Sequence, residues 1–133
     1  MANKFSLPQS ERIDSKKQID RLFRGGGSKA MSAFPLRVVY MLEESEPGSR
    51  GPQAQMMVSV PKRCFKRAVK RNRVKRQLRE AYRLNKHLLD AWLAQHPGRR
   101  LSMCFIWTAD SLHGTDGVTR QMASLLTRLA ERA

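Results

Sequence analysis

The amino-acid sequence predicts a single α+β domain, a two-layer sandwich in which helices cover one face of a β-sheet. Its 133 residues suit one hydrophobic core, and 41% of them are hydrophobic, which is enough to build it. Some short segments are rich in apolar, β-branched and aromatic residues, as strands are, whereas other segments repeat apolar residues at helical spacing. The resulting order is α-β-β-β-α-β-α, in which the first of the three consecutive strands is short. No repeat or low-complexity tract interrupts it, so residues 1–133 are expected to form one domain.

The first helix is expected at residues 16–24. Ser15 stands three residues before Gln18, which is the spacing of a capping box. Apolar residues then follow at helical intervals: Ile19, Leu22 and Phe23. Three glycines at 25–27 end the run, as glycines do at helix C-termini.

Two principal strands follow the first helix. Residues 33–42 (AFPLRVVYML) are rich in β-branched and aromatic side chains, with Pro35 near the start, and a brief strand is expected at 29–32. Residues 43–53 contain two prolines, two glycines and no apolar residue, which indicates an exposed turn. The second principal strand is expected at 55–60. Antiparallel pairing of the two is the simplest arrangement.

The second half of the chain is dominated by a long helix, with a pattern that starts near Phe65. Residues 71–95 contain no proline or glycine, and residues 96–98 (HPG) end the helix. Its apolar residues share one face: Val74, Leu78, Ala81, Tyr82, Leu88, Leu89 and Trp92. Residues 101–108 then predict a strand buried on both faces, and residues 118–129 a final amphipathic helix.

The charge of the chain indicates a polyanionic partner. Lysine and arginine number 26 against 11 acidic residues, a formal charge of +15 that repels itself in the folded state. Nucleic acid is the leading candidate and an anionic membrane the rival. The longest apolar run, 101–109, is half the length of a spanning helix, and the N-terminus lacks the apolar stretch of a signal peptide. We therefore expect a cytoplasmic protein without a membrane partner.

Residues that could carry catalysis or bind a metal are not evident. Cys64 and Cys104 stand alone, without a C-x-x-C motif or a histidine at zinc-ligand spacing. The three histidines are far apart and have no carboxylate partner that spacing identifies: His87, His96 and His113. We expect no catalytic side chain and no protein metal site.

The segment from 62 to 86 carries the chemistry. It holds 12 Lys or Arg among 25 residues with a single acid, Glu80. On a helical wheel its apolar residues face one way, and its polar residues form a stripe on another side: Asn72, Lys75, Arg76, Arg79, Arg83 and Lys86. Like charges at these spacings destabilise a free helix, and solvated faces usually mix signs. Phosphates of an RNA backbone would compensate the charge, so we expect an RNA-binding helix.

The sequence RNRVKRQLRE at 71–80 resembles the signature of the bacterial ribonuclease P protein family, and VSVPKRCFKRAVK at 58–70 resembles the segment that leads into it. The similarity extends from Ile19 to Phe105. It implies a small α+β sandwich like domain 2 of ribosomal protein S5, with a left-handed β-α-β crossover. It also implies a division of labour, in which a catalytic RNA hydrolyses precursor tRNA with bound Mg²⁺. The protein would bind that RNA and the 5′ leader.

The resemblance assigns roles by position. The residues matching the signature that lies against the catalytic RNA are Arg71, Asn72, Arg73, Lys75, Arg76 and Arg79. Basic neighbours are added on charge alone: Lys62, Arg63, Lys66, Arg67, Lys70 and Arg83. The leader cleft of the family corresponds here to Ile19, Phe23, Phe34 and Arg37. Ile19 and Arg37 depart from the family's aromatic pattern, and core packing is the alternative role for Phe23 and Phe34.

Two other functions are compatible with parts of the pattern. A non-catalytic, ribosomal-type binder of structured RNA would explain the charge and the fold, but not the long signature. A DNA-binding module would need a helix-turn-helix neighbour or a dimer seam beside the basic helix. The sequence indicates neither, because a strand leads into that helix, so we expect no DNA partner.

Overall fold

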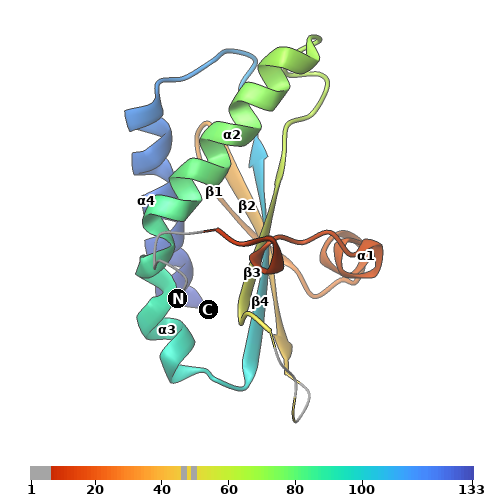
Figure 1. Cartoon of the computed structure of the whole chain (residues 1–133), viewed down its shortest axis with the longest axis vertical. Helices are drawn as coiled ribbons and strands as arrows, with labels where there is room; N and C mark the ends of the chain where they lie inside the picture. Colours follow the sequence, from red (N-terminus) through yellow and green to blue (C-terminus); the bar gives the residue numbers. More distant parts are fainter. Residues whose placement is uncertain (1–6, 46–47, 49–50) are drawn as a thin grey trace.

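The computed structural model describes residues 7–45, 48 and 51–133, and this part of the chain contains a mixed four-stranded sheet with helices on both faces (Figure 1). The strand order is β1-β2-β4-β3. The first two pairs, β1–β2 and β2–β4, are antiparallel, whereas β3 and β4 are parallel. The strand bounds are β1 Lys29–Ala33, β2 Leu36–Glu44, β3 Ala54–Ser59 and β4 Arg99–Trp107.

Most helices cover one face of this sheet. They are α2 (Ala68–Asn85), α3 (Asp90–Gln95) and α4 (Thr115–Arg132), with a short 3₁₀ turn η2 (Lys86–Leu89) between α2 and α3. On the opposite side lies α1 (Lys16–Arg24), preceded by the 3₁₀ turn η1 at residues 9–11, as Figure 1 shows. The predicted α+β class and the order α-β-β-β-α-β-α are confirmed. The expectation that helices cover only one face is wrong, because Leu22 of α1 is buried on the opposite face.

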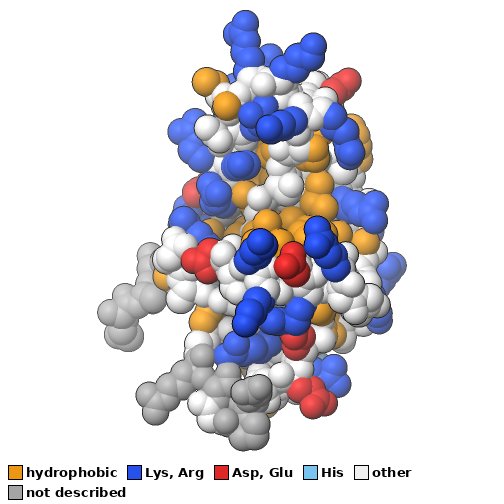
Figure 2. Space-filling view, turned by 90° about the vertical axis from the view of Figure 1, so that its right-hand side faces the viewer, with side chains coloured by type: hydrophobic (Ala, Val, Ile, Leu, Met, Phe, Trp, Pro, Cys, Tyr) orange, Lys and Arg blue, Asp and Glu red, His pale blue; other side chains and the backbone are white. Residues whose placement is uncertain are grey.

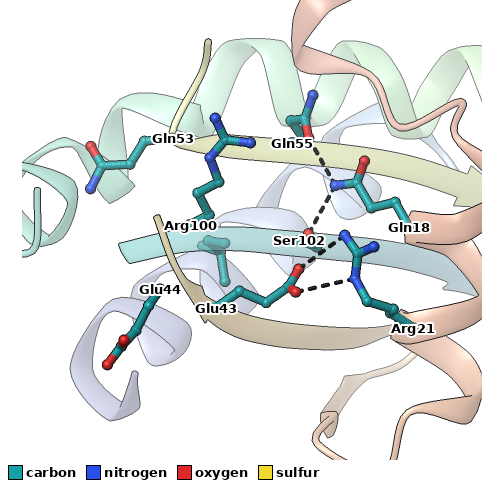
Figure 3. A pocket seen from close by; sticks show the side chains of 9 residues that line it. Gln18, Arg21, Glu43, Glu44, Gln53, Gln55, Arg100 and Ser102 are labelled. Atoms are coloured by element: carbon teal, nitrogen blue, oxygen red, sulfur yellow. Dashed lines mark hydrogen bonds and ion pairs between the residues drawn. The ribbon is translucent and has the colours of Figure 1, made fainter. Parts of the chain in front are cut away.

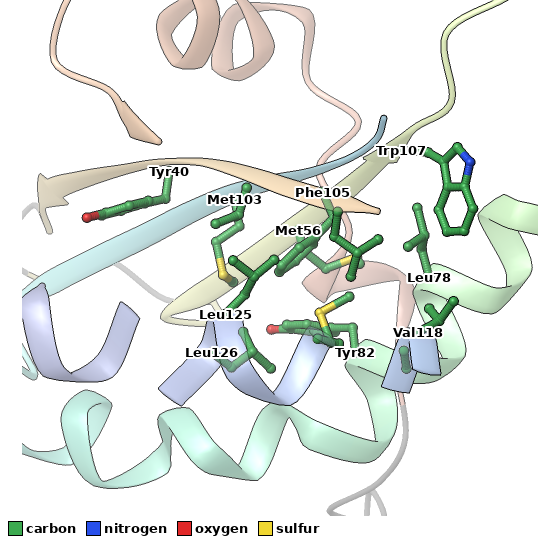
Figure 4. Close-up of a cluster of buried hydrophobic side chains, with 14 of the residues drawn as sticks. Tyr40, Met56, Leu78, Tyr82, Met103, Phe105, Trp107, Val118, Leu125 and Leu126 are labelled. Carbon is green, nitrogen blue, oxygen red and sulfur yellow. The ribbon is translucent and has the colours of Figure 1, made fainter. Parts of the chain in front are cut away.

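The main core lies between the sheet and the α2–α4 layer (Figure 4). Alternate residues of β4 point into it, with Phe105 and Trp107 fully buried, because successive strand side chains face opposite sides of a sheet. From α2, Leu78 and Tyr82 reach the same core one turn apart. Burial of this extent fixes the rotation of α2 about its own axis. Its opposite side therefore faces solvent.

A second apolar cluster lies beneath α1 on the other face of the sheet. Leu22 of α1 packs there with Ile13, Met41 and Cys104, all buried. Cys104 shows that β4 is buried on both faces, as predicted for residues 101–108. Burial raises the pKa of the Cys104 thiol to about 12, because the thiolate would lose its hydration.

Helix α1 begins and ends where the sequence predicts. The Ser15 hydroxyl accepts a hydrogen bond from the backbone N–H of Gln18 at 3.4 Å. Gly26 follows the helix with φ +76°, a left-handed conformation that glycine adopts without strain. The predicted bounds of 16–24 are confirmed.

Two sequence-based predictions about the strands are wrong. The strand expected at 33–42 is interrupted, because Phe34 and Pro35 form the turn between β1 and β2. The expected antiparallel pairing of 33–42 with 55–60 does not occur, because β4 lies between β2 and β3. An apolar strand such as β4 gains most when it is central, since there both of its faces are covered.

The long helix expected at 71–95 is also corrected. It ends at Asn85, whose side-chain amide donates to the Ala81 carbonyl at 2.8 Å, and η2 then tightens the backbone before α3. This break places Leu89 and Trp92 in the core. The parallel β3 and β4 strands are joined through α2, η2 and α3. The left-handed sense implied by the resemblance stays a prediction.

Candidate nucleic-acid interface

The outward side of α2 forms a continuous basic surface. Leu78, Ala81 and Tyr82 fix the inward side against the core, so the residues on the opposite side of the helix point away from it. We call this surface the basic face of α2. It comprises the exposed Lys70, Asn72, Arg73 and Arg76 and the partly buried Lys75, Arg79 and Arg83. Because α2 is anchored to the sheet, these charges are held on a rigid support.

A basic loop at residues 61–67 leads into α2. Buried Cys64 and Phe65 anchor it, while its four basic side chains are exposed: Lys62, Arg63, Lys66 and Arg67. The guanidinium of Arg71 donates to the carbonyl of Phe65 at 2.7 Å and to that of Lys66 at 2.8 Å. Arg71 therefore fixes the shape of the basic loop, a structural contribution that its place in the signature does not reveal.

Acidic side chains neutralise little of this surface. Among the described residues of the basic face and basic loop, only Arg83 forms an ion pair, with Glu80. That hydrogen bond is the main cause that lowers the pKa of Glu80 and raises the pKa of Arg83. Glu11 is engaged by Lys86 at 3.0 Å. The remaining charges therefore leave a strong positive potential for a polyanion.

The sheet face beside α1 offers a different surface. Figure 2, which faces α1, shows apolar side chains exposed next to the helix, with Lys and Arg side chains on both sides. The partly buried apolar residues of this face are Val39, Met57 and Ile106, which pack against the cluster beneath α1. Arg37 pairs in register with Ile106 and is exposed. We call this region the open sheet face.

The four residues assigned to the leader cleft come from three segments: Ile19 and Phe23 from α1, Phe34 from the β1–β2 turn and Arg37 from β2. Ile19 packs on the cluster beneath α1, and Phe23 on the same helix is 47% exposed. Phe34 is 64% exposed at the β1–β2 turn, where its ring meets the edge of His113 at 5.6 Å between centroids. Core packing is therefore wrong for Phe23 and Phe34. The contact to His113 places Phe34 against the loop that leads into α4.

A polar pocket between α1 and the sheet was not predicted. Its volume is about 360 Å³, and Figure 3 shows the side chains around it. The Gln18 amide donates to Gln55 Oε1 at 2.8 Å and to Ser102 Oγ at 3.0 Å, while Arg21 pairs with Glu43 at 3.1 Å. These contacts tie α1 to the sheet. The feature of the sequence that could have indicated this pocket is the polar Ser102 within the apolar run of 101–108.

The described part of the chain contains no group of three or more His, Cys, Asp or Glu residues placed to hold a metal ion. No helix within it is long and apolar enough to cross a membrane.

Comparison with known proteins gives a consistent result. The family model described as Ribonuclease P matches residues 7–129. A protein of Porphyromonas gingivalis named ribonuclease P protein component is 44% identical over 126 residues, which cover 95% of this chain and 88% of that one. Its namesake in Chlorobaculum tepidum is 35% identical over 107 residues, covering 78% and 68% of the two chains.

Solved structures show the same fold. The RNase P protein from Thermotoga maritima superposes with a TM-score of 0.65 at 17% identity, covering 89% of this chain and 96% of that one. The Staphylococcus aureus RNase P protein gives a TM-score of 0.63 at 16% identity, covering 90% and 94%. At such low identity these likenesses concern the fold alone.

Proposed function

Because the chain belongs to the ribonuclease P protein family, the subunits of an endoribonuclease that processes tRNA, we propose how its surfaces serve that complex. The basic face of α2 and the basic loop bind the catalytic RNA. The open sheet face beside α1 receives the 5′ leader of precursor tRNA. The single observation that carries the proposal is the uncompensated positive charge of a helix whose other side is locked in the core.

The geometry of α2 suits a phosphate backbone. From Lys70 to Arg83 the helix extends about 20 Å, at roughly 1.5 Å per residue. Arginine predominates on this face, and its planar guanidinium binds phosphate oxygens in pairs. Asn72, exposed among these arginines, adds a neutral amide that can orient a backbone oxygen. Binding would release counterions in proportion to the number of contacts.

The open sheet face suits a single strand. Phe23 is exposed on α1 and can stack on an unpaired base, which tolerates any sequence. Arg37, on the same side of the sheet, can bind a backbone phosphate or stack on a base plane. The apolar side chains of the open sheet face offer contact without base-specific hydrogen bonds. A leader could thus be held with little sequence preference.

No side chain of this protein is assigned to catalysis in the proposal. Mg²⁺ would supply the metal chemistry of the hydrolysis and would be held mainly by the catalytic RNA, whose phosphate oxygens are hard ligands. The described protein residues fit a supporting role, because they gather positive rather than negative charge. That charge reduces repulsion between catalytic RNA and substrate. The cytoplasm is the compartment proposed for the complex.

Reconstitution tests the proposal. Precursor tRNA is incubated at low Mg²⁺ concentration with the cognate catalytic RNA, with this protein, and with both. We expect cleavage only in the mixture, because the protein offsets phosphate repulsion that Mg²⁺ otherwise screens. Cleavage by the protein alone would contradict the assignment of chemistry to the RNA. Equal cleavage with and without the protein, together with tight binding to other structured RNA, would favour the ribosomal-type binder.

A further inference from the structure

A segment outside the signature brings one more arginine to α2. Arg12 forms a parallel bridge with Met56 of β3, and the Ile13 N–H donates to the Met56 carbonyl at 2.8 Å. Ile13 is buried in the cluster beneath α1. Neighbouring side chains of an extended segment point to opposite sides, so Arg12 is directed away from that cluster. It lies beside Arg79 of α2, and both residues line a hollow at the β3 edge.

The two guanidinium groups lack a compensating carboxylate. Within the described part of the chain neither Arg12 nor Arg79 forms an ion pair, since Glu11 pairs with Lys86 and Glu80 lies with Arg83. The Nε atom of Arg12 is buried without a hydrogen-bond partner. Partial burial, followed by the positive charge of Arg12, lowers the pKa of Arg79 below its ordinary value.

Such an arrangement is unfavourable without an anion. A buried donor with no partner costs free energy, and two like charges in a partly desolvated site repel one another. A phosphate would satisfy both, because each guanidinium can direct N–H donors at its oxygens. Backbone pairing with β3 fixes the main chain of Arg12 at the β3 edge, and its Nε atom is buried there rather than turned into water.

The pair also lies where the two proposed surfaces meet. One hollow of about 610 Å³, over the basic face of α2, is lined by Arg12 and Arg79 together with Arg73 and Arg76. Glu80 also lines it, but its carboxylate is paired with Arg83. A second, of about 240 Å³, is lined by the same two residues and by Met57 of the open sheet face. A strand of RNA that passed from one surface to the other would cross this pair.

We propose that Arg12 and Arg79 together bind one RNA backbone phosphate at the β3 edge. Arg12 is thereby an RNA-binding residue that the signature does not include. The inference rests on the proposed function, because it requires that α2 lies against RNA. The phosphate belongs either to the catalytic RNA or to the precursor leader, which share this chemistry.

Substitutions in the full-length protein test the site. The variants are Arg12→Gln, Arg79→Gln and the double substitution, with Arg12→Lys to retain charge and Arg132→Gln as a matched control on the exposed end of α4. Two affinities are measured over a range of salt concentrations. One is that of each protein for the catalytic RNA alone. The other is that of each holoenzyme for precursors with and without a leader. Thermal unfolding verifies that each variant is folded.

If the bound phosphate belongs to the catalytic RNA, Arg12→Gln should lower the affinity for that RNA by about 5- to 8-fold at 0.1 M salt. It should also lower the slope of log affinity against log salt by about 0.7–0.9. If the bound phosphate belongs to the leader, the same loss of affinity should appear only when the holoenzyme binds precursors that carry a leader. In either case Arg12→Lys retains most of the slope. The double substitution should cost less than the product of the single effects, because both residues hold one group.

Unchanged affinities and slopes for a folded Arg12→Gln protein would overturn the proposal, as would fully multiplicative effects of the two substitutions. A loss equal to that of Arg132→Gln would show a general charge effect and would likewise overturn it. Failure of the unsubstituted protein to bind the catalytic RNA would instead refute the proposed function. The two failures are therefore distinguishable.

Discussion

Neutralising Arg73 and Arg76 probes the basic face of α2 without disturbing the fold. Both side chains are exposed, and neither forms an ion pair among the described residues. Glutamine has nearly the helix propensity of arginine, so Arg73→Gln and Arg76→Gln should leave the stability of α2 almost unchanged. The expected effect is a loss of affinity for the catalytic RNA that depends steeply on salt.

The magnitude follows from counterion release. Each phosphate contact contributes a slope of about 0.7–0.9 in the dependence of log affinity on log salt. Relative to a 1 M reference, one contact is then worth about 5- to 8-fold in affinity at 0.1 M salt. Loss of two contacts should cost about 25- to 60-fold at 0.1 M and only about threefold at 0.5 M. The slope itself should fall by about 1.4–1.8.

Filter binding or fluorescence anisotropy with labelled catalytic RNA, repeated from 0.1 to 0.5 M salt, provides the assay. A double substitution on α4, Arg120→Gln with Arg132→Gln, removes the same charge from another helix. It should change the slope much less. An equal change for both pairs, or the same fold-loss at every salt concentration, would refute phosphate contact by α2.

Four further outcomes follow from the structure. Leu78→Ala in the core should lower the free energy of unfolding by about 2–5 kcal/mol in urea titrations; a loss below about 1 kcal/mol would contradict the packing. Phe23→Ala should weaken holoenzyme binding of leader-bearing precursors by about 1–3 kcal/mol and leave leaderless ones unaffected; equal losses for both would exclude a leader contact. A double-mutant cycle on Glu11 and Lys86 should give a coupling of about 1 kcal/mol, whereas additivity would show that the pair contributes nothing to stability. At pH 8 iodoacetamide should alkylate Cys104 only after unfolding, because the raised pKa keeps the folded thiol protonated; rapid labelling of the native protein would disprove its burial.

Local sequence patterns predicted a helix or strand well where the residues of that segment alone determine its structure. The limits of α1 follow from Ser15 and the glycines after Arg24, and the helical spacing of Leu78 and Tyr82 identified the buried side of α2. The pairing of strands could not be read in this way. Which strand lies between β2 and β3 depends on burial of β4 from both sides, and that is a property of the assembled sheet.

The candidate site was predictable to a similar degree. The density of positive charge in 62–86 is sufficient to identify the basic face from the sequence, because few functions other than phosphate binding need it. The role of Arg71 in holding the basic loop could not be foreseen, since it depends on carbonyl groups that only the folded loop presents. Arg12 was missed for the same reason. Its nearness to Arg79 arises from pairing of a distant segment with β3.

The central claim is that the outward side of α2 lies against the catalytic RNA, and a tethered cleavage reagent tests it most directly. Both native cysteines are buried, so an iron chelate can be attached selectively at Val69→Cys, a position 79% exposed in the first turn of α2, or at Thr127→Cys on α4 as the control. In the assembled holoenzyme we expect localised cuts in the catalytic RNA from position 69 and few or none from position 127. Cuts from position 127 without cuts from position 69 would contradict the account.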